Sequence, residues 1–231
     1  MFFLYNRKKD ETLLMDTGKR KKVGILGGTF DPIHTGHLIL AEAAYEAFSL
    51  DYVLIMPNGN PPHKAGQVNA TMLQRTQMAE LAVADNPHLR VSDFEKTPQD
   101  YHYTYETLEF LTKNNPDTDY YFILGADSLV HFHTWMEPQR ICDCCRILAA
   151  VRDGMKPLEL ESWIGALSKR FGARIYPLET TNIDISSNMI RERVQNHRSI
   201  RYYVPACVEA YIYAEGLYLS GEGEENGNEK L

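Results

Sequence analysis

Two histidines in a glycine-rich stretch are the residues of this chain most able to do chemistry. The apolar run 23–26 leads directly into Gly-Gly-Thr-Phe-Asp-Pro-Ile-His-Thr-Gly-His at positions 27–37, and residues 38–48 follow with helical spacing of apolar side chains. Paired glycines let a backbone approach a ligand closely, and free N–H groups at a helix N-terminus favour phosphate. The pattern predicts a strand, a tight turn at Gly27 and Gly28, and the start of a helix.

The spacing of His34 and His37 places both rings on one side of the first helical turn if the helix begins near Pro32, which suits a first helical position. A cation at this end opposes the helix dipole, so two histidines favour an anionic ligand. The histidine pair by itself leaves two alternatives. The two residues either have no functional role or are two ligands of a metal site that lacks a third ligand. The stretch matches neither the dinucleotide-binding G-x-G-x-x-G nor the G-x-x-x-x-G-K-[ST] phosphate loop.

A loop after the second predicted strand carries another basic pair. Residues 57–64 read Pro-Asn-Gly-Asn-Pro-Pro-His-Lys, and the prolines and Asn-Gly predict a rigid loop. This loop would present His63 and Lys64 at the carboxyl edge of a sheet. An isolated His-Lys pair is more often an ordinary exposed surface feature.

A capped helix start near the C-terminal third carries a further cation. Residues 186–191 read Ser-Ser-Asn-Met-Ile-Arg, and a serine or asparagine there caps free N–H groups. Arg191 lies four residues after Ser187, on the same face and near the positive helix end, where a cation favours a bound anion. The pair predicts a second phosphate clamp, with simple capping as the alternative.

Three more residues are candidates for the site. Gly125 and Asp127 follow the apolar run 120–124, a pattern also typical of an aspartate that caps a helix. Trp135 is one of two tryptophans, and it either packs in the core or offers a flat ring to a pyridinium cation.

Four motifs in the same order resemble those of one family. The sequence over 27–37 is similar to the signature of the H-x-G-H nucleotidyltransferase superfamily, and closest to that of the nicotinate-nucleotide adenylyltransferase family. The P-P-H-K loop, the Gly-Ala-Asp after residue 124 and the Ile-Ser-Ser-Asn-Met-Ile-Arg segment also resemble that family, from about Val23 to Leu219. Asn188 stands where the family usually has threonine, and Met136 where many relatives have an aromatic residue.

The resemblance implies transfer of AMP from ATP to nicotinate mononucleotide by direct in-line attack, giving deamido-NAD and pyrophosphate in NAD biosynthesis. It implies ATP contacts from Gly27, Gly28, Thr29, Phe30, His34, His37, Gly125, Asp127, Ile185, Ser186, Ser187 and Arg191. It implies nicotinate mononucleotide contacts from Thr29, Lys64, Thr104, Trp135 and Met136, with His34, His37, Lys64 and Arg191 as the catalytic set. Mg²⁺ is expected to bind mainly through the ATP phosphates, without a metal site made by protein side chains.

The elements that must position these residues alternate along the chain. Short apolar runs at 23–26, 52–56, 120–124, 147–151 and 174–178 predict strands, and the segments between them have helical spacing. This alternation predicts an α/β fold, a Rossmann-like doubly wound parallel sheet with helices on both faces. We expect a flexible basic extension over residues 1–22, a single nucleotidyltransferase domain over 23–219 and an acidic disordered tail over 220–231.

Composition narrows the class of protein. The chain has 231 residues, a net charge of −7 and a mean hydropathy of −0.37. The acidic balance argues against a nucleic-acid partner, and the absence of a long apolar run argues against a membrane partner or export. The four cysteines indicate no disulfide framework, so we expect reduced thiols in a cytoplasmic protein.

Alternatives remain at the level of substrate and of function class. Nicotinamide mononucleotide is nearly isosteric with the nicotinate form, and only donors placed against the carboxylate would separate the two. Phosphopantetheine is a weaker rival acceptor, because its enzymes lack the P-P-H-K and Trp135 features. A nucleotide-binding sensor without turnover is the alternative from another class. The sequence leaves open a homodimer or a higher homo-oligomer.

Overall fold

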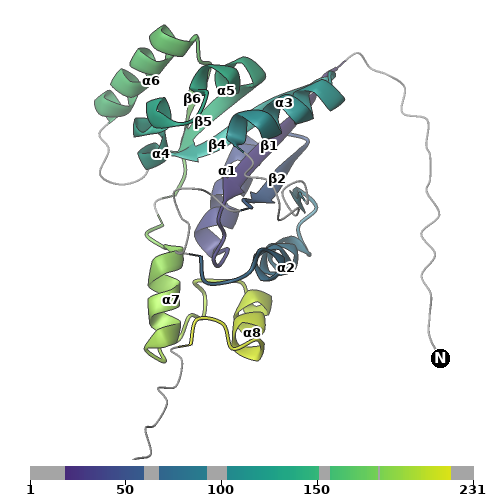
Figure 1. Cartoon of the computed structure of the whole chain (residues 1–231), viewed down its shortest axis with the longest axis vertical. Helices are drawn as coiled ribbons and strands as arrows, with labels where there is room; N and C mark the ends of the chain where they lie inside the picture. Colours follow the sequence, from purple (N-terminus) through teal and green to yellow (C-terminus); the bar gives the residue numbers. More distant parts are fainter. Residues whose placement is uncertain (1–18, 60–67, 93–102, 151–156, 182, 220–231) are drawn as a thin grey trace, which may run out of the picture.

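A parallel sheet forms the centre of the computed structural model, which describes residues 19–59, 68–92, 103–150, 157–181 and 183–219 (Figure 1). Within these residues the strand order is β3-β2-β1-β4-β5-β6, and every neighbouring pair is parallel. The strands are β1 (Lys21–Gly28), β2 (Tyr52–Pro57), β3 (Leu89–Val91), β4 (Thr118–Gly125), β5 (Cys145–Ala150) and β6 (Ile175–Leu178). The order reverses between β1 and β4, which confirms the predicted doubly wound sheet.

Helices cover both faces of the sheet. They are α1 (Thr35–Phe48), α2 (Met72–Val83), α3 (Thr104–Asn114), α4 (Ala126–Val130), the 3-10 turn η2 (Phe132–Thr134), α5 (Pro138–Cys144), α6 (Pro157–Phe171), α7 (Ser187–Gln195) and α8 (Ala206–Ala214). One core cluster joins the sheet to α1, α2, α7 and α8, and a second joins it to α3, α4, α5 and α6. Figure 1 shows α7 and α8 together at the end of the molecule away from α6.

The strands reach both core clusters because their side chains alternate. In β4, Tyr121 and Ile123 belong to the cluster under α1, whereas Tyr120, Phe122 and Leu124 belong to the cluster under α3. All five are buried, as a sheet with helices on both faces requires.

The first strand is longer than predicted. It begins at Lys21, two residues inside the segment predicted as an extension, and it continues through Gly27 and Gly28. These glycines pair with Met56 and Pro57 of β2, so the predicted tight turn at Gly27 and Gly28 is wrong. The chain turns after them instead. Residues 1–18 and the predicted tail over 220–231 lie outside the described residues.

The cysteines are free in the structure, as predicted. Cys142 and Cys145 stand in a C-x-x-C spacing, but both are buried, and burial raises the pKa of the Cys142 thiol to about 11. Burial therefore favours the neutral form of both thiols, which is a poor nucleophile. Among the described residues, none of the helices is sufficiently long and apolar to span a membrane.

Candidate functional site

The predicted site residues Gly28 and Gly125 lie where the strand order reverses. In doubly wound sheets ligands bind outside the carboxyl ends of the strands at this switch point, which here lies between β1 and β4. Gly28 ends β1 and Gly125 ends β4. A Cβ added at Gly125 would meet no atom within 4 Å outside its neighbours, so there is open space beside the end of β4.

His34 caps helix α1 and does not lie inside it. Its backbone is extended, with φ −144° and ψ 168°, and the helix begins at Thr35. Pro32 therefore precedes the cap, and its predicted place at the first helical position is wrong. The chain turns at Phe30, which has a positive φ of 49°, and the Asp31–Pro32 bond is cis.

The two histidines form one stacked unit. Their ring centroids are 3.6 Å apart, with 21° between the planes, which confirms that they share one side of the helix start. The Phe30 and His37 rings are perpendicular, with their centroids 4.9 Å apart. His34 is buried and His37 half-buried, and a Cβ at Gly36 would lie 3.2 Å from Nδ1 of His34.

Capping fixes the hydrogen-bonding state of His37. The backbone N–H of His34 donates to Nδ1 of His37 at 3.2 Å. A neutral imidazole that accepts at Nδ1 carries its proton on Nε2. His37 therefore presents an Nε2–H donor, which is what an anionic ligand at this helix end needs.

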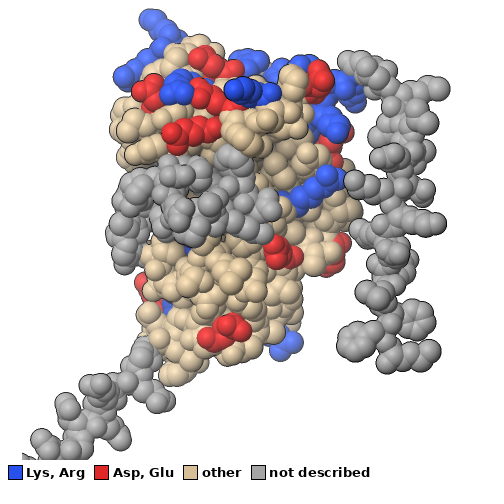
Figure 2. All heavy atoms as spheres, turned by 45° about the vertical axis from the view of Figure 1, so that its right-hand side comes forward, with Lys and Arg blue, Asp and Glu red and all other residues tan. Residues whose placement is uncertain are grey.

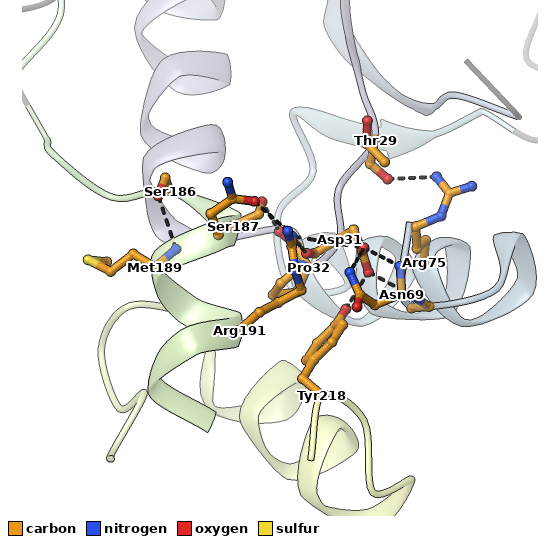
Figure 3. A network of polar contacts seen from close by, with 12 residues as sticks. Thr29, Asp31, Pro32, Asn69, Arg75, Ser186, Ser187, Met189, Arg191 and Tyr218 are labelled. Carbon is orange, nitrogen blue, oxygen red and sulfur yellow. Dashed lines mark hydrogen bonds and ion pairs between the residues drawn. The ribbon is translucent and has the colours of Figure 1, made fainter. Parts of the chain in front are cut away.

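A buried aspartate anchors the loop after β1. Asp31 is 3% exposed, and its carboxylate accepts hydrogen bonds from the backbone N–H groups of Asn69 and Ala70 at 2.8 and 3.1 Å. The hydroxyl of Tyr218 also donates to it, at 2.8 Å, and Arg191 lies 3.9 Å away (Figure 3). Burial, followed by the charge of Asp31, raises the pKa of Tyr218, so the phenol keeps its proton and remains a donor.

Helix α7 docks onto the same loop through the predicted clamp residues. Arg191 donates to the carbonyl of Asp31 at 2.7 Å and also to the Asn188 side chain. Ser187 donates to the carbonyl of Pro32 at 2.8 Å. The structure thus brings Ser187 and Arg191 to the histidine loop, and Figure 3 shows them on the side of Asp31 away from Arg75. Contact of either with phosphate stays a prediction.

The start of α7 is built as the sequence predicts. Ser186 caps the helix, because its side chain accepts from the N–H of Met189 at 3.2 Å. Ile185 is half-buried and packs against the core cluster under α1.

Three residues that matter to this geometry escaped the sequence analysis: Asp31, Arg75 and Tyr218. Arg75 is 1% exposed and donates to the carbonyl of Thr29 at 2.6 Å. A charged residue among the apolar positions of the α2 face was the available signal. Tyr218 is 187 residues from Asp31 in sequence, so no local pattern indicates their contact.

The predicted acceptor residues lie around α3 and α5. Thr104 begins α3, and Trp135 follows η2. The half-buried Trp135 ring packs edge-on against Phe122 at 6.2 Å and tilted against Phe132 at 5.5 Å. It therefore has core contacts and an accessible part, while Met136 is 51% exposed.

An ion pair links α3, which begins at Thr104, with α5, which follows Trp135 and Met136. Arg140 of α5 donates to both carboxylate oxygens of Glu109 in α3, at 2.6 and 2.5 Å, and lies 4.2 Å over the Tyr105 ring. The hydrogen bond from Arg140 lowers the pKa of Glu109. These contacts fix α3 against α5.

The position of one predicted residue, Asp127, needs correction, and two others, His63 and Lys64, fall outside the described residues. Asp127 is the second residue of α4, so it does not occupy the cap position that precedes the helix. His63 and Lys64 lie outside the described residues.

The described side chains indicate where a metal ion or a phosphate group could bind. Within the described part of the chain, no group of three or more His, Cys, Asp or Glu side chains could hold a metal ion. A hollow of about 360 Å³ lies between α1 and residues 179–181, but Glu42, Glu46 and Glu179 line it and would repel phosphate. On the face in Figure 2, basic and acidic side chains are mixed over the upper part, and the lower part is mostly uncharged.

Comparisons with known proteins agree with this geometry. Residues 25–193 match the model of the cytidylyltransferase-like family. A "Probable nicotinate-nucleotide adenylyltransferase" of Lachnoclostridium phytofermentans is 42% identical over 199 residues, covering 86% of this chain and 100% of the relative. One of the same description from a Thermoanaerobacter species is 40% identical over 207 residues, covering 89% and 97%.

A solved structure shares the fold. The nicotinic acid mononucleotide adenylyltransferase of Plasmodium falciparum, in complex with NaAD, has a TM-score of 0.72 at 20% identity, covering 86% of this chain and 97% of that one. This likeness shows a shared fold, and the sequence matches show the family. This chain belongs to the cytidylyltransferase-like family and, within it, to the nicotinate-nucleotide adenylyltransferases.

Proposed function

We propose that this protein transfers AMP from ATP to nicotinate mononucleotide, forming deamido-NAD and pyrophosphate. The observation that carries the proposal is the stacked pair of His34 and His37 at the switch point, on a loop anchored by buried charges. The relatives at about 40% identity, which this chain matches over nearly their whole length, support the choice of substrates.

The reaction needs no protein nucleophile. A phosphate oxygen of the mononucleotide attacks the α-phosphorus of ATP, the new P–O bond forms in line with the one that breaks, and pyrophosphate leaves with the bonding electron pair. Holding the two reactants in this geometry is worth about 7–11 kcal/mol of the barrier. The protein therefore acts by positioning and by stabilising charge.

The phosphate side has donors suited to that task. His37 offers Nε2–H, and His34 lies stacked against it. Arg191 and Ser187 already bond to the loop backbone, so they are preorganised close to it. We assign His34, His37, Arg191 and Lys64 to stabilising the charge that develops on the bridging and leaving oxygens.

Mg²⁺ fits this site as a partner of the substrate. The oxygens of Asp31, the buried carboxylate nearest the histidines in sequence, accept hydrogen bonds from three residues, so they are not disposed as ligands. When bound, Mg²⁺ would neutralise phosphate charge and keep several waters, as this ion does in other nucleotide sites. The side chains described above would then hold the remaining phosphate oxygens.

On the acceptor side, we assign the half-buried Trp135 to stacking on the pyridinium and Thr104, at the start of α3, to contact with the mononucleotide. Stacking with cation–π attraction is worth about 1–2 kcal/mol when desolvated.

A cytoplasmic location belongs to the same proposal. The reaction uses ATP, and the free cysteines of the protein fit a reducing compartment. Size-exclusion chromatography with light scattering would establish whether a homodimer or higher homo-oligomer forms.

The test is pyrophosphate release with ATP and Mg²⁺, offering nicotinate mononucleotide, nicotinamide mononucleotide and phosphopantetheine in parallel. We expect a kcat/KM preference of about a hundredfold or more for the nicotinate form, which requires donors against its carboxylate. Equal use of both pyridine nucleotides would keep the reaction and overturn the acid-specific assignment. ATP binding without release from any acceptor would favour a nucleotide-binding sensor.

A further inference from the structure

A buried arginine joins the ends of two neighbouring strands. Arg75, in the second turn of α2, donates through Nη1 to the carbonyls of Thr29 and Asn58 at 2.6 and 2.8 Å. Its Nη2 donates to the carbonyl of Gly59 at 2.9 Å and to the sulfur of Met72 at 3.3 Å. Thr29 follows β1, and Asn58 and Gly59 follow β2, so one side chain holds both loops at the carboxyl edge of the sheet.

The chemistry of this contact requires the guanidinium group. Its planar fork presents several N–H donors in fixed directions, whereas a lysine ammonium is a compact charge on a flexible stem. Arg75 is 1% exposed, and burying a cation costs free energy unless hydrogen bonds satisfy it. A hydrophobic residue would fill the same space on α2 without that cost, so packing alone does not explain an arginine here.

The bonds to carbonyls also orient peptide groups. A trans peptide is planar, and its C=O and N–H point in opposite directions. Because the Thr29 carbonyl faces Arg75, the N–H of Phe30 faces away from α2. Figure 3 shows Arg75 reaching Thr29 on one side of the loop, with Ser187 and Arg191 on the other.

The start of α2 is itself fixed to the same loop. Asp31 accepts hydrogen bonds from the backbone of Asn69 and Ala70, just before the Thr71 cap of α2. Arg75 reaches Thr29 from the next turn. The loop after β1 is therefore held to α2 at two points, and the direction of the Thr29 carbonyl follows from the geometry of Arg75.

We infer that Arg75 is a positioning residue for nucleotide binding, which sets the orientation of the Thr29–Phe30 peptide group and the separation of the loops after β1 and β2. It acts through the backbone and touches no reacting atom. The effect of Arg75 on catalysis rests on the proposed function. Its effect on nucleotide binding can be measured without an acceptor.

The experiment compares Arg75→Lys, Arg75→Gln and Arg75→Met with the unaltered protein. Calorimetry gives the Kd of a non-hydrolysable ATP analogue, and thermal unfolding gives each melting temperature, with binding measured well below it. We expect Arg75→Lys to raise the Kd about tenfold, a shift of one decade in affinity. Misplacement of the reactants should lower kcat/KM about a hundredfold.

The matched control is Arg20→Lys. Like Arg75, Arg20 donates to a backbone carbonyl, that of Thr118, but it also donates to the Asp119 carboxylate and lies at the opposite edge of the sheet. We expect its analogue Kd to stay within about twofold of the unaltered protein, as for an exposed ion pair.

Three outcomes would overturn the inference. One is a lower melting temperature for the Arg75 variants with an unchanged analogue Kd, which is what a purely structural role gives. Another is equal binding by Arg75→Met and Arg75→Lys at the affinity of the unaltered protein. The third is failure of all three variants to fold, which assigns Arg75 to stability. Analogue binding by a protein that releases no pyrophosphate would contradict the proposed reaction and leave the role of Arg75 standing.

Discussion

The two sides of the candidate site are held in place by different means. On the phosphate side, the loop after β1 is anchored by Asp31 and Arg75, which are 3% and 1% exposed. On the acceptor side, α3 and α5 are joined by Arg140 and Glu109, whose side chains are 43% and 39% exposed. Hydrogen bonds to buried charges are strong and costly to break, whereas exposed ion pairs contribute little.

This difference matches what each side has to do. Phosphate charge develops in one place during the reaction, and preorganised donors stabilise it best when they do not move. An acceptor ring needs a surface of the right shape, and we propose the half-buried Trp135, packed on Phe122 and Phe132, for that role. Changes on the phosphate side should therefore lower turnover or stability, and changes on the acceptor side should mainly alter KM.

The largest effect is expected from His37→Ala. This change removes an Nε2–H donor and the cap that His37 gives to the N–H of His34. Loss of one donor to developing charge typically costs about 10²–10³-fold in kcat. Steady-state pyrophosphate release measures it, and circular dichroism checks that the variant is folded.

His37→Asn is the informative companion, because its amide can still cap the helix start while donating differently. If a folded His37→Ala protein kept a near-normal kcat, the charge-stabilising role of the histidines would be wrong. His34→Ala should also lower kcat, since the two rings are stacked.

The next effect concerns the anchor of the same loop. Tyr218→Phe keeps the buried ring and deletes only the hydroxyl that donates to Asp31 at 2.8 Å. A hydrogen bond to a charged group is worth about 1.5–3 kcal/mol. We expect the free energy of unfolding, from urea denaturation, to fall by that amount and kcat to fall with it.

Tyr213→Phe is the matched control, because Tyr213 is 48% exposed on α8. Removal of its hydroxyl should leave both quantities within error of the unaltered protein. An equal loss in the two variants would show that the buried anchor is no stronger than a surface contact, and would remove the distinction between the two sides.

Periodicity and spacing predicted much of the fold. Five of the strands were expected from apolar runs, and their alternation with helices gave the doubly wound sheet. Strand β3 was missed because Leu89–Val91 is too short for a pattern to form. Gly27 and Gly28 were assigned to a turn because glycine is common in turns, although here they complete a strand.

Contacts among the candidate site residues were predicted where motifs are local and missed where the contacts are long-range. His34 and His37 are three residues apart, the spacing of a cap and the third residue of its helix, so their proximity follows from a local pattern. Asp31 and Tyr218 meet only because the fold brings the C-terminal segment back to the first loop. The position of Pro32 was wrong because the extended backbone of His34 moves the helix start to Thr35.

A moderate effect is expected on the acceptor side from Trp135→Ala. Loss of stacking and cation–π attraction of about 1–2 kcal/mol should raise the KM for nicotinate mononucleotide about 5- to 30-fold, with the KM for ATP little changed. Trp163→Ala is the control, because this second tryptophan lies in α6 and stacks on His133. If Trp135→Ala lowers the melting temperature and leaves both KM values unchanged, the core contacts of Trp135 are its function.

The smallest effect is expected from Glu109→Gln. The hydrogen bond from Arg140 lowers the pKa of Glu109 from its usual 4.5, so the folded state favours the carboxylate. The stabilisation is then fully present above pH 4.5 and is lost as the pH falls through the lower folded value. Melting temperatures of the two proteins should differ slightly at pH 7 and converge in acid, with the acceptor KM changed less than about twofold.

A matched control for this last variant is Glu161→Gln, which removes the same charge from an exposed position on α6. It should leave the acceptor KM unchanged. A melting difference for Glu109→Gln that grows as the pH falls has the wrong sign for a carboxylate with a lowered pKa. A loss of turnover as large as that of His37→Ala would mean that the exposed ion pair fixes the site as firmly as the buried anchors do, and that exposure does not divide its two sides.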